Sequence, residues 1–124
     1  MARIGLVAHD DKKDEMVKWA LANREVLSLH QLWGTGTTGG RVAAGTGLEV
    51  ELLKSGPLGG DAQLGAMICE GRLDVLIFFQ DPLTAMPHDV DIKSLTRLAT
   101  LYNIPFAPNL ATADAVLAAL RPVV

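Results

Sequence analysis

Short apolar runs alternate with longer amphipathic segments along the 124-residue chain. Runs such as residues 74–79, "DVLIFF", have the length and composition of strands that are buried on both faces of a sheet. Segments such as residues 91–103, "DIKSLTRLATLYN", have the apolar spacing of a helix with one buried face. The pattern predicts strands at 3–9, 31–35, 49–55, 74–79 and 104–109, and helices at 12–27, 38–47, 61–72, 91–103 and 112–120.

This alternation predicts the class of fold. A helix between two strands returns the chain to the starting edge of the sheet, so successive strands run in the same direction. We therefore expect an α/β fold, a three-layer open sheet of five mainly parallel strands with helices on both faces, formed by residues 1–124 as a single domain. Ligands of such folds bind at the carboxyl ends of the strands, so the loops after the first four strands should face one crevice.

Charge and hydropathy exclude several classes of protein. The net charge is −3 and no run of Lys or Arg is present, which argues against a general nucleic-acid binder. No apolar run approaches the roughly 18 residues that a membrane span needs. The N-terminus also turns polar too early for a signal peptide. These features predict a soluble, cytoplasmic protein with no nucleic-acid or membrane partner.

The cysteine and histidine content argues against a metal site. The chain has one cysteine and three histidines, without the spacing of metal ligands, so we expect no metal and activity that survives chelation. Cys69 lies inside the apolar pattern "LGAMICEG", where we expect it to be buried as a packing residue.

Two glycine-rich loops follow predicted strands and open predicted helices. Residues 35–40 read "TGTTGG", and residues 55–61 read "SGPLGGD", with Ser55 as a hydroxyl donor and Gly56 allowing close approach of a ligand. Free backbone N–H groups and the positive end of a helix dipole favour an anion at such a loop. Neither a P-loop nor a dinucleotide fingerprint is present, which favours a small phosphate ester over a nucleotide. A simple capped turn is the alternative for the first loop.

An acid stands at the mouth of the second loop. Asp61 would repel a phosphate group placed beside it. It is therefore either the N-cap of the following helix or a group that acts on a different part of the ligand.

Titratable residues also follow the first predicted strand. His9 and Asp10 leave this strand, and Lys13 lies one helical turn beyond His9. Their position favours a role in the crevice, while solvated loop residues are the alternative.

The loop after the fourth predicted strand offers a similar choice. Asp81 either ends the strand before a proline or is a site carboxylate. His88 is either a site residue or a solvated one, and one of Asp89 and Asp91 is expected to cap the next helix.

Six motifs together resemble the methylglyoxal synthase family over essentially the whole chain. They are "LVAHD" (6–10), "TGTTG" (35–39), "SGPLGGD" (55–61), "DVLIFFQDP" (74–82), "PHDVD" (87–91) and "NLATAD" (109–114). The resemblance implies a carbon–oxygen lyase that converts dihydroxyacetone phosphate to methylglyoxal and inorganic phosphate through an enediolate. It also implies a homohexamer that phosphate inhibits and that needs no metal or organic cofactor.

The resemblance also implies roles for individual residues. Asp61 corresponds to the catalytic base, and His88, with His9, can donate hydrogen bonds to the enediolate oxygens. Asp10, Asp81 and Asp91 correspond to the other active-site carboxylates of the family. The residues implied to bind the substrate and its phosphate are His9, Lys13, Thr35, Gly36, Thr37, Thr38, Ser55, Gly56 and His88.

A regulatory ligand-binding domain is the alternative function. The same fold occurs as an allosteric module of larger enzymes such as carbamoyl phosphate synthetase, and a binding module could keep the threonine-rich loop without acid–base groups. The joint presence of Asp61, His88 and the His9–Asp10 pair favours the enzyme.

Overall fold

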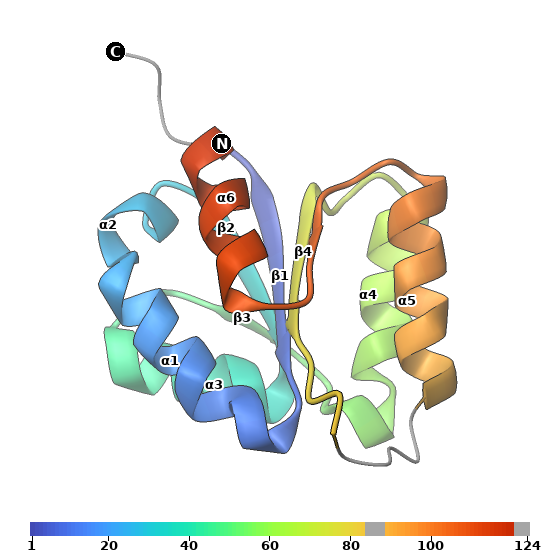
Figure 1. Cartoon of the computed structure of the whole chain (residues 1–124), viewed down its shortest axis with the longest axis horizontal. Coiled ribbons are helices and arrows are strands. Elements are labelled where there is room, and N and C mark those ends of the chain that lie inside the picture. The colour runs from blue at the N-terminus through green and yellow to red at the C-terminus, as the bar shows by residue number, and fades with distance from the viewer. Residues whose placement is uncertain (84–88, 121–124) are drawn as a thin grey trace.

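The computed structural model describes residues 1–83 and 89–120, without the side chains of 89–91, and it places a five-stranded sheet between two layers of helices (Figure 1). The strands are β1 (Arg3–Ala8), β2 (Gln31–Thr35), β3 (Glu51–Leu53), β4 (Val75–Phe79) and β5 (Phe106–Ala107). The α-helices are α1 (Lys13–Ala22), α2 (Arg24–Leu27), α3 (Gly36–Thr46), α4 (Gly60–Cys69), α5 (Asp89–Leu101) and α6 (Leu110–Leu120). Two 3₁₀ turns, η1 (Asp10–Lys12) and η2 (Gly56–Leu58), follow β1 and β3.

The order of strands in the sheet is β3-β2-β1-β4-β5, and all neighbouring strands are parallel. The chain first builds outward from β1 to β3 and then returns past β1 to β4 and β5. Helices α1, α2, α3 and α6 cover one face, and α4 and α5 cover the other (Figure 1). The direction of winding reverses between β1 and β4, and in open α/β sheets the crevice at this point binds ligands. The predicted α/β class with a parallel sheet is confirmed.

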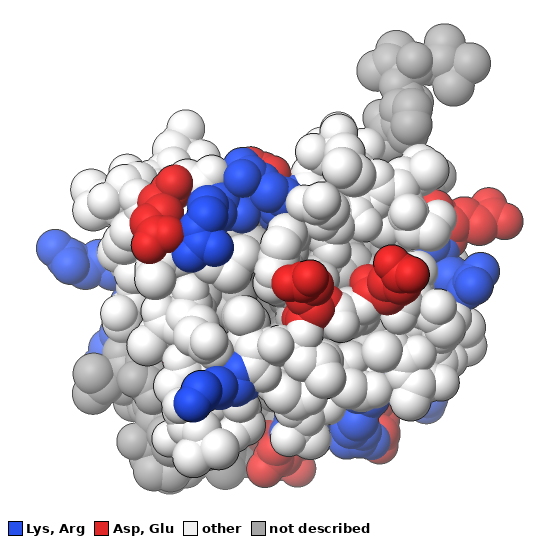
Figure 2. Space-filling model, turned by 180° about the vertical axis from the view of Figure 1, so that it is seen from behind, with Lys and Arg blue, Asp and Glu red and all other residues white. Residues whose placement is uncertain are grey.

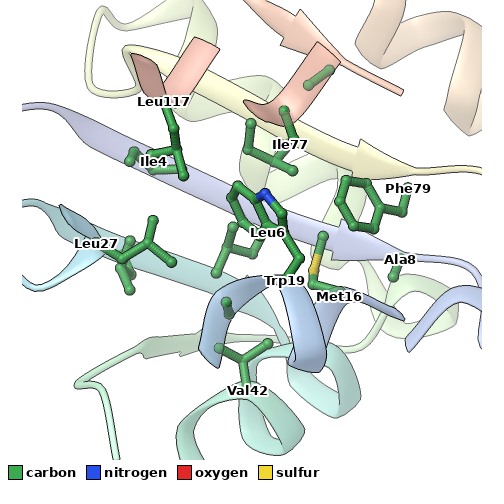
Figure 3. Packing of buried hydrophobic residues seen from close by; sticks show 14 of the residues in the cluster. Ile4, Leu6, Ala8, Met16, Trp19, Leu27, Val42, Ile77, Phe79 and Leu117 are labelled. Atoms are coloured by element: carbon green, nitrogen blue, oxygen red, sulfur yellow. The ribbon is translucent and has the colours of Figure 1, made fainter. Parts of the chain in front are cut away.

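The strands send alternate side chains into two apolar cores, because successive residues of a strand point to opposite faces. Ile4, Leu6 and Ala8 of β1 pack under the α1, α3 and α6 layer, whereas Val7 packs under α4 and α5. Figure 3 shows Trp19 of α1 lying across the first of these cores. Burial on both faces explains the uninterrupted apolar runs of the central strands.

A pair of glycines lets α3 begin directly against the sheet. A Cβ atom built on Gly34 of β2 would lie 2.6 Å from the Cα atom of Gly39 in α3. Any side chain at Gly34 would therefore push the helix away from the strand that precedes it. The close contact holds the first turn of α3 at the carboxyl end of β2.

Several predicted boundaries were wrong, although the predicted order of elements is confirmed. The helix expected at 12–27 is divided at Asn23, whose backbone has φ −111° and ψ 22° and whose side-chain amide donates to the Trp19 carbonyl oxygen at 2.9 Å. Asparagine competes in this way with the helical hydrogen bonds of the backbone. The strand expected at 104–109 has two paired residues, because Pro105 and Pro108 on either side of them cannot donate to the ladder.

Cys69 is exposed, contrary to the prediction. It ends α4, and the buried residues of that helix, among them Leu64 and Ile68, lie on the opposite stripe. The apolar run before Cys69 is buried through Met67 and Ile68, whereas Cys69 itself, at the end of the helix, is exposed.

No helix within the described residues is both long and apolar enough to cross a membrane.

Candidate active site

A pocket of about 460 Å³ opens at the carboxyl ends of the strands, on both sides of the reversal between β1 and β4. Four loops contribute to it, namely those after β1, β2, β3 and β4. The lining residues are Val7, Ala8, His9, Asp10, Asp11, Lys13, Thr35, Thr37, Thr38, Ser55, Gly56, Pro57, Asp61, Phe78, Asp81 and Ile92. The expected crevice and most of the residues predicted to face it are therefore brought together.

The loop after β1 supplies a lysine that is held in place. The Nζ atom of Lys13 lies 2.7 Å from Oδ1 of Asp10, and the exposed fractions of the two side chains are 13% and 93%. The hydrogen bond from Lys13 lowers the pKa of the Asp10 carboxyl. Asp10 thus lies at the rim and remains charged beside Lys13, the first residue of α1, which lines the pocket and is mostly buried. Among the described lining residues, Lys13 is the only lysine or arginine.

His9 is fixed by the end of β4. Its backbone N–H donates to the Phe79 carbonyl oxygen at 3.0 Å, and its Nδ1 atom accepts a hydrogen bond from the Asp81 backbone N–H at 2.8 Å. The imidazole ring also contacts Phe78 edge to face, with ring centroids 5.2 Å apart. The contact with Asp81 joins residues that are 72 positions apart in the chain.

The threonine-rich loop forms the start of α3. Thr35 occupies the N-cap position and Thr38 lies in the first turn, and both are buried, whereas Thr37 is exposed. The Thr38 hydroxyl donates to the Ala8 carbonyl oxygen at 3.5 Å, a long bond that leaves this hydroxyl close to the end of β1. The first N–H groups of a helix have no carbonyl partner within it, so the N-terminus of α3 offers donors to an anion.

Gly36 is not among the residues that line the pocket, but it joins the two glycine-rich loops. Its N–H donates to the Lys54 carbonyl oxygen at 3.3 Å. A Cβ atom on Gly36 would lie 3.2 Å from the backbone nitrogen of Ser55. Glycine at this position therefore lets the loops after β2 and β3 lie side by side.

Asp61 lies in the first turn of α4 and lines the pocket, but it is not the helix cap. The N-cap position is Gly59, with φ 105°, and Asp61 is the second residue of the helix. Its carboxylate is turned toward the preceding loop, because a Cβ atom on Gly56 would lie 3.7 Å from Oδ2 of Asp61. Of the two interpretations of this acid, the N-cap is wrong.

Asp81 closes a turn at the end of β4. Its Oδ1 atom accepts a hydrogen bond from the Leu83 backbone N–H at 3.0 Å, which is the geometry of an Asx turn. Asp81 also lines the pocket, so its position leaves a role as a site carboxylate open.

Two predicted site residues cannot be placed in the pocket. His88 lies outside the described residues, and so does the side chain of Asp91, whose backbone belongs to α5. The same holds for the prediction that Asp89 or Asp91 caps that helix.

Sequence reasoning missed several lining residues, most of them apolar. Phe78 and Val7 belong to strands and form part of the pocket wall, while Pro57 and Ile92 contribute from η2 and α5. Alternation along β1 and β4 puts Val7 and Phe78 on one face of the sheet, whereas Ala8, which also lines the pocket, lies on the other face, so alternation alone does not identify the lining residues. No pattern in the sequence indicated that Asp11 would line the pocket.

The overall charge of the protein does not favour an anion, so an anionic ligand would have to be bound by groups inside the pocket. The chain carries a net charge of −3. On the face shown in Figure 2, basic and acidic side chains lie in small separate groups and much of the surface is uncharged. Within the described residues, no three histidine, cysteine or acidic side chains are grouped as metal ligands would be. The arrangement therefore suits a small anionic ester near N–H groups, hydroxyls and Lys13, with the Asp61 carboxylate lining the same pocket.

Comparison with known proteins gives a consistent result. The family model for the MGS-like domain matches residues 15–107. The methylglyoxal synthase of Agrobacterium fabrum is 63% identical over 112 residues, which are 90% of this chain and 88% of the relative. That of Lysinibacillus sphaericus is 52% identical over 119 residues, 96% of this chain and 89% of the relative. The crystal structure of methylglyoxal synthase from Elizabethkingia anophelis matches with a TM-score of 0.89 and 48% identity, covering 94% of this chain and 76% of that one.

Proposed function

The chain belongs to the methylglyoxal synthase family, and we propose that its pocket converts dihydroxyacetone phosphate to methylglyoxal and inorganic phosphate with Asp61 as the catalytic base. As a member of this family the protein is a lyase. The assignment of Asp61 rests on its position. It lines the pocket, its carboxylate lies beside the Ser55–Gly56 turn, and it is not the helix cap.

The substrate has chemically different ends, which explains an acid within an anion site. The phosphate end is bound by the donors at the start of α3, the Ser55 hydroxyl and Lys13. The hydroxymethyl end carries no charge, so it can approach the Asp61 carboxylate. The C–H bonds of that end are acidic because they adjoin the carbonyl group, and a carboxylate base can remove one proton.

Proton removal leaves the electron pair in an enediolate, whose oxygens need hydrogen-bond donors. We assign this role to His88, with His9 as a second donor. The hydroxyl proton on the former hydroxymethyl carbon passes to the neighbouring enediolate oxygen, and the oxygen that lost it forms an aldehyde group with its electron pair. The double bond shifts to the carbon that carries the phosphate ester, the carbon–oxygen bond there breaks, and phosphate leaves with the bonding pair. The remaining enol tautomerises to methylglyoxal.

Elimination requires the bond to phosphate to stand perpendicular to the enediolate plane, because only then does its antibonding orbital overlap the π system. An isomerase acting on the same intermediate has to avoid this geometry. The donors that hold the phosphate, Thr35 to Thr38 and Ser55, therefore decide the outcome as well as the affinity.

We further propose that the enzyme is a cytoplasmic homohexamer that inorganic phosphate inhibits. The family resemblance supports the hexamer.

The test is whether the purified protein releases orthophosphate and a dicarbonyl in equal amounts from dihydroxyacetone phosphate, before and after dialysis against EDTA. We expect equal release in both samples. Tight binding of the substrate without either product would instead identify a regulatory ligand-binding domain. Loss of activity on dialysis, with recovery on addition of zinc or magnesium, would contradict metal-independent catalysis.

A further inference from the structure

The end of β4 fixes one ring nitrogen of His9. The Asp81 backbone N–H donates to Nδ1 at 2.8 Å, and the Phe78 ring contacts the imidazole at a centroid distance of 5.2 Å. The backbone N–H of His9 is bound to the Phe79 carbonyl oxygen at 3.0 Å. These contacts with β4 and with the segment directly after it restrict both the position of the ring and its rotation about χ2.

This contact decides where the imidazole carries its proton. A ring nitrogen that accepts a hydrogen bond does so with its lone pair and therefore carries no hydrogen. A neutral imidazole whose Nδ1 is the acceptor thus carries its hydrogen on Nε2. The ring then presents a hydrogen-bond donor at Nε2 and cannot act there as a proton acceptor.

The side chain of Asp81 stabilises the backbone that makes this contact. Its Oδ1 atom accepts the Leu83 backbone N–H at 3.0 Å and closes an Asx turn across Pro82. The turn limits the rotation of the peptide groups that follow β4. It thereby helps to keep the Asp81 N–H directed at His9.

Building on the proposed function, we propose that Asp81 is a positioning residue that acts through its backbone N–H, holding His9 as the neutral Nε2–H tautomer that donates a hydrogen bond to a substrate oxygen. This role differs from that of a carboxylate acting on the substrate, which the family resemblance implies for Asp81. It also differs from that of a charged imidazolium binding the phosphate.

Nitrogen NMR of the histidine-labelled, substrate-free protein at neutral pH tests the tautomer directly. We expect an unprotonated Nδ1 and a protonated Nε2 for His9. His30 is an internal reference, because its Nδ1 also accepts a backbone N–H, from Ala2 at 2.9 Å, and His30→Gln assigns its signals. A protonated Nδ1 on His9, alone or together with a protonated Nε2, would overturn the proposal whether or not the protein turns over substrate.

Amide substitutions of His9 separate the acceptor from the donor. In His9→Asn the side-chain oxygen can replace Nδ1, but no donor reaches the position of Nε2. In His9→Gln the amide nitrogen can replace the Nε2 donor. We expect His9→Asn to lower kcat by about 100-fold and His9→Gln to lower it less. The reverse ranking would show that Nε2–H is not the working group.

Substitutions of Asp81 separate its turn from its charge. Asp81→Asn keeps an oxygen for the Asx turn, whereas Asp81→Ala loses it. We expect Asp81→Ala to mix the His9 tautomers and to lower kcat by about tenfold or more, with a smaller change in both for Asp81→Asn. If Asn costs as much kcat as Ala while the His9 tautomer is unchanged in both, the carboxylate itself takes part in the chemistry and the proposal fails.

Discussion

At the scale of single residues, the position of Asp61 in α4 separates its chemistry from its effect on the fold. It is the second residue of the helix, and Gly59 occupies the cap position. A change of its charge should therefore alter the reaction far more than the stability. The opposite would hold for an N-cap aspartate, whose loss costs about 0.5–2 kcal/mol.

Asp61→Asn should lower turnover by about 100- to 10,000-fold, because an amide cannot accept the C–H proton. Binding of a phosphate-bearing enediolate analogue should stay the same or tighten, since one negative charge leaves the anion site. Phosphate release measures the first effect and calorimetry the second. Lys13→Ala is the matched control and should weaken binding of the analogue.

Hydrogen exchange identifies the base independently of phosphate release. Asp61→Asn should stop exchange of the hydroxymethyl hydrogen of the substrate with deuterated water. Near wild-type exchange in Asp61→Asn, combined with its loss in Asp91→Asn, would show that the base is misassigned.

His30 should make the stability depend on pH near neutrality. Burial lowers its pKa from the ordinary value of 6.5, and its Nδ1 accepts the Ala2 N–H. Below about pH 6.5 the unfolded chain therefore binds a proton more readily than the folded protein does, and stability falls as the pH falls. Urea unfolding between pH 7.5 and about 5 should show a smaller decrease for His30→Gln than for the wild type. An equal decrease would assign the effect to other groups.

At the scale of elements, the site depends on how closely two helices begin against the sheet. Helix α3 starts at Gly36 directly after β2, and α4 starts at Gly60 beside the end of β3. A Cβ atom on Gly60 would lie 1.9 Å from the Lys54 carbonyl oxygen. Since that oxygen belongs to backbone, neither partner can move aside as a flexible side chain would. The first turn of α4, and Asp61 with it, is therefore placed by this contact.

Gly60→Ala should destabilise the protein by about 1–3 kcal/mol, the usual cost of overpacking, and should lower kcat because Asp61 is the next residue. Denaturant unfolding and phosphate release measure the two effects. Gly40→Ala in α3 is the matched control, since a Cβ atom there meets nothing within 4 Å. It should be neutral or stabilise by up to about 1 kcal/mol. Unchanged stability and rate in Gly60→Ala would mean that the contact does not set the start of α4.

At the scale of the whole molecule, the proposed hexamer predicts how the rate responds to phosphate. Inorganic phosphate should compete for the donors at Thr35 to Thr38 and Ser55, and it should favour a low-affinity state of the assembly. Light scattering should then give a hexamer, and added phosphate should make the saturation curve sigmoidal. A monomer with hyperbolic, phosphate-insensitive kinetics would remove the hexamer and leave the reaction assignment intact.

Local patterns in the sequence were sufficient for the class of fold and for much of the pocket. Apolar periodicity depends on which face of an element is buried, so it predicted the succession of strands and helices along the chain and the parallel sheet, but not the order of the strands within the sheet. Glycine and hydroxyl-bearing residues at 35–40 and 55–61 predicted two loops that line the pocket, because backbone freedom and short hydroxyl side chains are local properties.

Only the tertiary structure decided which distant groups meet. The pairing of β1 with β4 places the Asp81 N–H against Nδ1 of His9, and no periodicity specifies a contact across 72 residues. The close approach of Gly60 to the Lys54 carbonyl makes Asp61 the second residue of α4 instead of its cap. The sequence of this protein thus determined its elements and its types of chemical group. The geometry between those groups depended on packing of the sheet and helices, which brings together residues that are far apart in the chain.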